Sequence, residues 1–143
     1  MKKNFIIPFD VVELEPDNLH IVASAEINGT PFNVVLDTGA SHTCFDLDFI
    51  KNLNPNQAME QNDGLNVGIG SEFESQLATI ENFKLGDFVV DGYNVVLLDM
   101  SNINSVYEKM DKPLIHCILG SDFFVRFKAV IDYKKREMKI SSK

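Results

Sequence analysis

Short runs of β-branched and aromatic residues, separated by turn residues, make up most of the hydrophobic pattern of this sequence. Runs of this kind are typical of β-strands. Asn28-Gly29 separates two of them, and an Asn-Gly pair readily adopts the positive φ angles that a tight hairpin turn requires. The pattern predicts strands at residues 5–9, 19–27, 32–36, 76–85, 88–98, 114–119, 129–133 and 138–141, with breaks or turns at 86–87, 91–92 and 134–137.

Helical signals are few and short. Asp46 is a candidate cap for a helix over residues 46–52, and a second helix is expected over 101–110. Residues 121–127 begin with Ser and Asp and carry apolar residues three and four apart, which favours a third helix. Many short strands with two or three short helices predict a mostly-β domain.

The chain has 143 residues, so a single domain spanning 1–143 is expected. Its 21 acidic residues outnumber 13 Lys and Arg, and the formal net charge is −8. This charge argues against nucleic acid or an anionic membrane as a partner, because both attract a basic surface. The two cysteines are too few for a disulfide framework and lack the spacing of metal ligands, so no metal or other cofactor is expected.

The N-terminus begins with lysines, as a secretory signal does, but its apolar run ends after Phe5, Ile6 and Ile7. A signal peptide needs an apolar core of about 7–15 residues. A membrane-spanning helix needs about 20. We therefore expect a cytoplasmic protein, although a leader that had been removed would leave no trace in this sequence.

Residues 54–66 are polar and rich in amide side chains, and they lead into a glycine-bearing segment that contains Gly68, Ile69, Gly70 and Ser71. This composition indicates a mobile loop or a hairpin tip. Loops of this kind often cover binding sites. An ordinary surface insertion is the alternative interpretation.

The most informative segment is a run of apolar residues that ends in Asp37-Thr38-Gly39. An Asp after three apolar residues is costly to ionise unless it accepts hydrogen bonds or shares its proton. Gly39 allows a sharp turn that brings its N–H close to the carboxyl group, and the Thr38 hydroxyl can both donate and accept. A turn that merely closes a strand fits this tripeptide equally well.

A second apolar segment, Ile115-His116-Cys117-Ile118-Leu119-Gly120, is followed by Ser121-Asp122-Phe123-Phe124. Together with Val-Val-Leu-Asp-Thr-Gly-Ala-Ser at 34–41, it resembles the retropepsin-like aspartic proteases, the retroviral-protease-type enzymes and their bacterial relatives. Their pattern is an Asp-Thr-Gly-Ala-Ser/Thr after apolar residues, a glycine-bearing flap, then Ile-Leu-Gly-x-Asp-Phe/Leu and a short helix. The resemblance covers about residues 19–140 and leaves the first 15 residues unassigned.

The resemblance implies a closed-barrel-like acid protease fold and hydrolysis of a peptide or protein substrate. Many bacterial relatives carry Asp-Gly where this chain has His116-Cys117, and an ordinary surface His and a half-buried Cys are the alternative interpretation. By resemblance, the catalytic carboxylate is Asp37, supported by Thr38, Gly39, Ala40 and Ser41; the cleft is lined by His42, His116, Cys117 and Ile118; and the flap contains Gly68, Ile69, Gly70 and Ser71.

Hydrolysis by paired carboxylates needs two acids that share one proton. The sequence contains one Asp-Thr-Gly and no Asp-Ser-Gly, so one chain supplies half of such a site. We therefore expect a homodimer in which a two-fold axis brings the two copies of Asp37 together.

Two other functions stay open at this point. A dimer that keeps the fold without catalysis could act as a peptide-binding or interaction module. A plain structural β domain could use Asp-Thr-Gly as a turn only.

Overall fold

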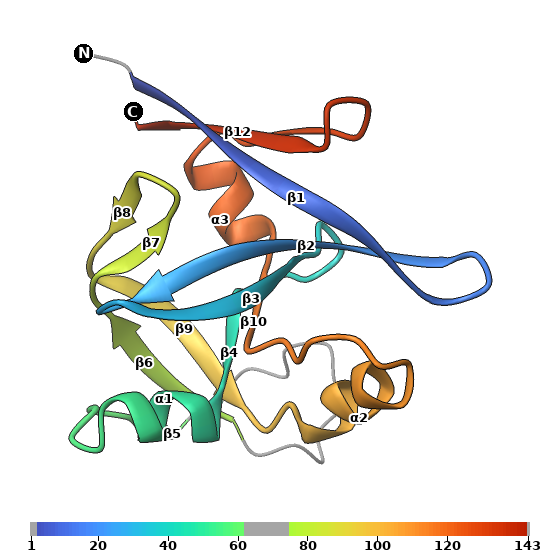
Figure 1. The fold of residues 1–143 in the computed structure, drawn as a ribbon. Coiled ribbons are helices and arrows are strands. Elements are labelled where there is room, and N and C mark those ends of the chain that lie inside the picture. The colour runs from blue at the N-terminus through green and yellow to red at the C-terminus, as the bar shows by residue number, and fades with distance from the viewer. Residues whose placement is uncertain (1–2, 62–74, 143) are drawn as a thin grey trace.

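The computed structural model describes residues 3–61 and 75–142, which form mostly strands, as predicted (Figure 1). Each helix has fewer than ten residues. The elements in chain order are β1 (Lys3–Glu15), β2 (Asn18–Ile27), β3 (Thr30–Leu36), β4 (Cys44–Asp46), α1 (Leu47–Leu53), β5 (Glu60–Gln61), β6 (Gln76–Ile80), β7 (Phe83–Leu85), β8 (Phe88–Val90), β9 (Tyr93–Leu98), α2 (Ser101–Lys109), β10 (Cys117–Leu119), α3 (Ser121–Arg126), β11 (Val130–Asp132) and β12 (Glu137–Ser142).

The strands pair in the order β11-β12-β1-β2-β3-β10-β4-β9-β6-β5, with β7 and β8 attached beside β2. Among the described residues β11 and β5 lie at opposite ends of this path and do not pair, so the prediction of a closed barrel is wrong in this detail. The physical reason lies in β1, whose first half pairs with β12 up to Pro8 and whose second half pairs with β2 from Phe9. The sheet therefore divides along β1, as Figure 1 shows where β1 crosses the fold.

Strand β1 is 13 residues long and covers residues 3–15, of which the sequence pattern predicted a strand at 5–9 and to which the family resemblance assigned no role. In its first half the side chains alternate, with Ile7 and Phe9 buried and Ile6, Pro8 and Asp10 exposed; Leu14, beyond the alternating part, is buried in a second core cluster. This period of two is what a strand with one buried face requires. The predicted hairpin between β2 and β3 is confirmed, with positive φ at the Asn-Gly pair.

Some strand boundaries differ from the prediction. Residues 76–85 form two strands rather than one, because Asn82 adopts φ 56° and donates its N–H to Asp91 Oδ1 at 2.6 Å. The strand predicted at 114–119 is shortened to β10, and β4 was not predicted. The helix α1 begins after Asp46, as expected, but this carboxylate accepts a hydrogen bond from the Met100 N–H at 3.1 Å instead of capping its own helix.

The main core is rich in phenylalanine. The Phe45 ring meets Phe83 edge-to-face at 5.4 Å, and Phe83 also contacts the rings of Phe32 and Phe123. Aromatic pairs in these arrangements add to the stabilisation that burial provides. The sequence-based interpretation of the phenylalanines at helical spacing as core rather than as a ligand-binding stripe is confirmed: Phe45, Phe123 and Phe124 are buried, and Phe49 and Phe127 pack against them.

The arrangement of β3, β10 and β4 places the candidate site. Strand β10 lies between the other two, parallel to β3 and antiparallel to β4. The connection from β3 to β4, residues 37–43, must therefore pass over the C-terminal end of β10. This crossing brings the Asp-Thr-Gly segment and the Leu119-Gly120 segment together. Within the described ranges no helix has the length and apolar character needed to cross a membrane.

Candidate active site

Asp37 lies immediately after β3, with its side chain exposed. Its N–H donates to the Leu119 carbonyl at 3.0 Å, which extends the pairing of β3 with β10 by one bond. The Gly39 N–H donates to Asp37 Oδ1 at 2.9 Å, and the Ala40 N–H donates to the Asp37 carbonyl at 3.1 Å. This turn holds the carboxyl group at the surface while one of its oxygens accepts a backbone N–H.

Glycine suits position 39 because a Cβ atom there would lie 3.3 Å from Asp37 Oδ1. That separation is tighter than an ordinary van der Waals contact, so a larger residue would push against the carboxyl group. The sequence-based expectation that Gly39 brings its N–H close to the Asp37 carboxyl group agrees with this geometry.

The loop of residues 37–43 rests directly on Gly120. A Cβ atom at Gly120 would lie 2.8 Å from the Ala40 carbonyl oxygen and 2.8 Å from the His42 carbonyl carbon, so only glycine fits without a backbone shift. The next residue continues the contact, because the Ser121 N–H donates to the Ala40 carbonyl at 2.7 Å. The Ile-Leu-Gly and Asp-Thr-Gly motifs are therefore two sides of one contact.

A chain of hydrogen bonds lies beneath this loop and was not found from the sequence. Thr43 is fully buried, accepts the Gly120 N–H at 3.1 Å and donates to Asp122 Oδ1 at 2.9 Å. The Tyr93 hydroxyl donates to Asp122 Oδ2 at 2.9 Å. Burial raises the pKa of Tyr93, and the nearby Asp122 carboxylate raises it further. The signal in the sequence was a hydroxyl residue, Thr43, directly before the apolar pair Cys44-Phe45.

Thr38 and Ser41 are exposed, and neither makes a side-chain hydrogen bond within the described part of the protomer. Ala40 contributes through its backbone only, as described above. The predicted supporting residues thus divide into backbone anchors, Gly39 and Ala40, and side chains that face outward.

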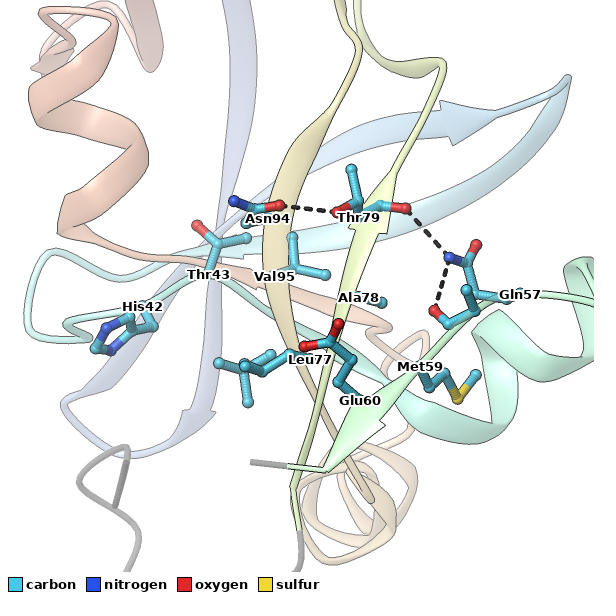
Figure 2. A pocket seen from close by; sticks show the side chains of 12 residues that line it. His42, Thr43, Gln57, Met59, Glu60, Leu77, Ala78, Thr79, Asn94 and Val95 are labelled. Atoms are coloured by element: carbon cyan, nitrogen blue, oxygen red, sulfur yellow. Dashed lines mark hydrogen bonds between the residues drawn. The ribbon is translucent and has the colours of Figure 1, made fainter. Parts of the chain in front are cut away.

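His42 borders a cavity of about 510 Å³ that lies between the Asp37 loop and strands β6 and β9. Figure 2 shows His42 at one side of this cavity, with Leu77 and the Glu60 carboxylate extending across from β6 and β5. His42 Nδ1 is buried and has no hydrogen-bond partner among the described residues. Asp37 does not line this cavity, so the cavity adjoins the Asp-Thr-Gly turn through His42 and Thr43.

His116 lies against α1 rather than beside His42. Its ring stacks on Phe49 with 4.4 Å between centroids, and it borders a second cavity of about 280 Å³ with carboxylates from Asp46, Asp48 and Asp99. Burial lowers the pKa of His116, and the nearby Asp46 carboxylate opposes this shift. The structure thus places His42 and His116 at separate cavities.

The placement of Cys117 does not agree with the prediction that it lines a cleft. Its side chain is fully buried in the main core. Opposite residues of an antiparallel pair share a face, so Cys117 shares its face with Phe45, while Cys44 shares the other face with Ile118. Ile118 is half-buried and packs against the two smaller core clusters, one of which contains Val35 and the other Cys44.

The two cysteines are free thiols on opposite faces of the sheet. Burial raises the pKa of Cys44 to about 12 and that of Cys117 well above its usual value. Both are therefore structural residues. In residues 3–61 and 75–142, no three His, Cys, Asp or Glu side chains are grouped to hold a metal ion. The flap residues Gly68, Ile69, Gly70 and Ser71 lie outside the described residues.

Comparisons with solved structures show a shared fold. A retropepsin-like aspartic protease from Rickettsia conorii matches with 16% identity and a TM-score of 0.56, covering 99% of this chain and 92% of its own. The retroviral protease-like domain of Ddi1 from Leishmania major matches with 15% identity and a TM-score of 0.58, covering 85% and 87%. The EIAV protease in complex with the inhibitor HBY-793 matches with 22% identity and a TM-score of 0.52, covering 73% and 85%.

Comparison with protein families gives a direct assignment. The Aspartyl protease family matches residues 23–123, which include the Asp37 turn, the cavity beside His42 and the Gly120 contact. Among curated proteins, none matches the sequence significantly. From the family match, the chain belongs to the Aspartyl protease family, and its fold is that of the retropepsin-like aspartic proteases.

Proposed function

We propose that this protein is an aspartic endopeptidase that works as a homodimer, with Asp37 of each protomer forming the catalytic pair. The observation that carries the proposal is the exposed Asp37 carboxyl group, which accepts one backbone N–H in a turn anchored to Leu119 and Gly120. An exposed acid on a firmly held loop is free to meet a second acid across a two-fold axis.

The chemistry follows from two carboxyl groups that share one proton. The ionised Asp37 takes a proton from a water molecule, and the resulting hydroxide attacks the peptide carbonyl carbon. The protonated Asp37 of the other protomer donates its proton to the carbonyl oxygen. The tetrahedral intermediate then collapses, the C–N bond breaks, and a proton passes to the departing nitrogen. No metal or cofactor takes part in this scheme.

The surrounding residues have supporting roles in this proposal. Thr38 faces outward and is available to hydrogen-bond across the dimer axis, which would lock the two turns together. Gly39 orients the carboxyl group through its N–H. The cavity bordered by His42 accommodates a substrate side chain next to the turn, and its volume of about 510 Å³ exceeds that of any one side chain.

The test is cleavage of a peptide library by the wild-type protein and by Asp37→Asn. We expect cleavage by the wild type, its block by a transition-state-mimicking inhibitor of aspartic proteases, and a loss of about 10³-fold or more in kcat/KM for Asp37→Asn. Equal and inhibitor-insensitive behaviour of the two proteins would instead support a non-catalytic peptide-binding module.

Asp132→Asn is the matched control. Asp132, the last residue of β11, also accepts backbone N–H groups in a turn, those of Lys134 and Lys135. Loss of a turn acceptor alone should therefore leave proteolysis within about twofold of wild type. An equal loss in both variants would mean that the turn, and not the acid, is what activity requires.

A further inference from the structure

The hydrogen bonds beneath the Asp37 loop have a fixed direction. The Thr43 hydroxyl has one proton, which it donates to Asp122 Oδ1, so the same oxygen is free to accept the Gly120 N–H. The Tyr93 hydroxyl donates to Asp122 Oδ2. An ionised carboxylate only accepts, and therefore both hydroxyl protons point toward Asp122.

These groups are removed from solvent. Thr43 has 0% exposure and Tyr93 has 3%, while Asp122 is half-buried. A buried hydroxyl left without a partner is costly. Hydrogen bonds to a charged acceptor are also shorter and stronger than neutral ones. Arg126 lies over the Tyr93 ring at 5.4 Å and makes no ion pair with Asp122 within the described ranges. The carboxylate is held by the two hydroxyl groups.

The segment 119–122 contacts the Asp37 loop at its beginning, middle and end. At the beginning, the Asp37 N–H donates to the Leu119 carbonyl. In the middle, the Ser121 N–H donates to the Ala40 carbonyl. At the end, Thr43 joins Asp122 through side chains. The first two contacts join backbone atoms, so the third, between Thr43 and Asp122, is the anchor that a side-chain substitution can remove.

We propose that Asp122 and Thr43 are positioning residues that fix the Asp37 loop, and with it the catalytic carboxyl group, through the Gly120–Thr43–Asp122–Tyr93 hydrogen-bond chain. The inference rests on the proposed function of Asp37. A misplacement of about 1 Å can cost roughly 10²-fold in rate even when the substituted residue lies far from the chemistry. Loss of this anchor should lower kcat and leave KM close to its wild-type value.

The central variants are Thr43→Val, which keeps the shape and removes the hydroxyl group, and Thr43→Ser, which restores it. We expect kcat per active site, counted with a tight-binding inhibitor, to fall by roughly 10- to 100-fold in Thr43→Val with KM within about twofold. Thr43→Ser should recover most of kcat. A structural role alone would reduce the number of active sites and leave kcat per site unchanged, which would overturn the inference.

Two further variants test the proposal if Thr43→Val fails to fold. Asp122→Asn keeps one acceptor for Thr43, and Tyr93→Phe removes only the distal hydroxyl group, so both should fold and lower kcat by smaller factors. Wild-type kcat in both would contradict the proposal.

Amide exchange separates this inference from the proposed function. The Gly39 and Ala40 N–H groups report opening of the turn, because both donate to Asp37. We expect at least about tenfold faster exchange in Thr43→Val than in Thr43→Ser. If the wild-type protein does not cleave peptides but amide exchange is still faster in Thr43→Val, the positioning role is supported and the protease function is rejected. If exchange is the same in Thr43→Val and Thr43→Ser, the positioning role itself is rejected.

Discussion

Asp37 and Asp122 are two aspartates that follow neighbouring parallel strands, β3 and β10, whose last residues Leu36 and Leu119 pair in register. Asp37 comes directly after β3, and Asp122 lies in the first turn of α3, which follows β10. Their surroundings differ. Asp37 is exposed and accepts one backbone N–H, whereas Asp122 is half-buried and accepts two hydroxyl groups from other elements. The first carboxyl group is left open toward a second molecule, and the second ties three segments together. In our proposals, the first acid performs the chemistry and the second holds the loop that carries it.

The largest expected effect on stability follows from substituting Gly120, which lies against the loop of residues 37–43. Gly120→Ala places a Cβ atom 2.8 Å from backbone atoms of Ala40 and His42. We expect a loss of about 2–3 kcal/mol in the free energy of unfolding. This corresponds to a fall of roughly 5–10 °C in Tm, measured by thermal unfolding at fixed protein concentration.

Gly29→Ala serves as the control for Gly120→Ala. Gly29 has a positive φ of 85° but open space around its Cβ position. Its substitution should cost about 1 kcal/mol, from backbone strain alone. If Gly120→Ala were no more destabilising than Gly29→Ala, this result would contradict the close contact of Gly120 with the loop of residues 37–43.

The direct comparison of the two acids comes next in size. Asp122→Ala leaves two buried hydroxyl groups without their acceptor and should lower the free energy of unfolding by about 2 kcal/mol. Asp37→Ala removes an exposed acceptor and should change stability by less than about 0.5 kcal/mol. Urea unfolding at one protein concentration measures both. Equal losses in the two variants would remove the distinction between an open and a structural carboxylate.

A smaller effect is expected in alkaline solution. Burial and the Asp122 carboxylate raise the pKa of Tyr93, and burial alone raises the pKa of Tyr107 to about 12. The unfolded chain loses these protons near pH 10, while the folded protein keeps them, so stability falls as the pH rises above about 10. Unfolding at pH 9 and pH 11 should show a smaller fall in Tyr93→Phe and Tyr107→Phe than in wild type. An equal fall in stability in all three proteins would contradict the attribution of this loss to the raised pKa values of Tyr93 and Tyr107.

The smallest effect is expected at the cysteines. Both thiols are buried, on opposite faces of the sheet, with raised pKa values. The folded protein should therefore not react with a thiol reagent at pH 8, and the urea-unfolded chain should react with two equivalents of the reagent. Rapid reaction of the folded protein with one or two equivalents would show that at least one of the two thiols reaches the surface, against their assignment as buried residues.

The local structures that were predicted correctly depend on residues close together in the sequence. The Asp37 turn and the hairpin at Asn28-Gly29 follow from residues within a few positions of each other. Only residues 5–9 of strand β1 were predicted, because Asp10, Glu13 and Glu15 on its exposed face interrupt the apolar pattern after Phe9. The placement of Cys117 follows from strand alternation, which sets it on the face opposite to Ile118 and could have been deduced from the sequence.

The Asp122 interactions were beyond sequence reasoning for a different reason. Asp122 meets Thr43 across 79 positions of the chain and Tyr93 across 29. In the sequence, Ser121-Asp122 indicates the start of a helix and belongs to the segment that carries the family resemblance, but neither signal identifies the partners of the Asp122 side chain; α3 does begin there. The crossing of residues 37–43 over β10, which brings these residues together, is a property of the strand order β3-β10-β4 and of no short segment.

The central claim is that two protomers join their Asp37 side chains into one catalytic pair. A crystal structure of the assembled protein with a peptide-like inhibitor measures the distance between the two carboxyl groups directly. We expect the nearest oxygens at hydrogen-bonding distance, about 3 Å, on either side of a two-fold axis. Two Asp37 side chains that face apart, separated by more than the roughly 4–6 Å over which carboxyl groups couple strongly, would contradict the account.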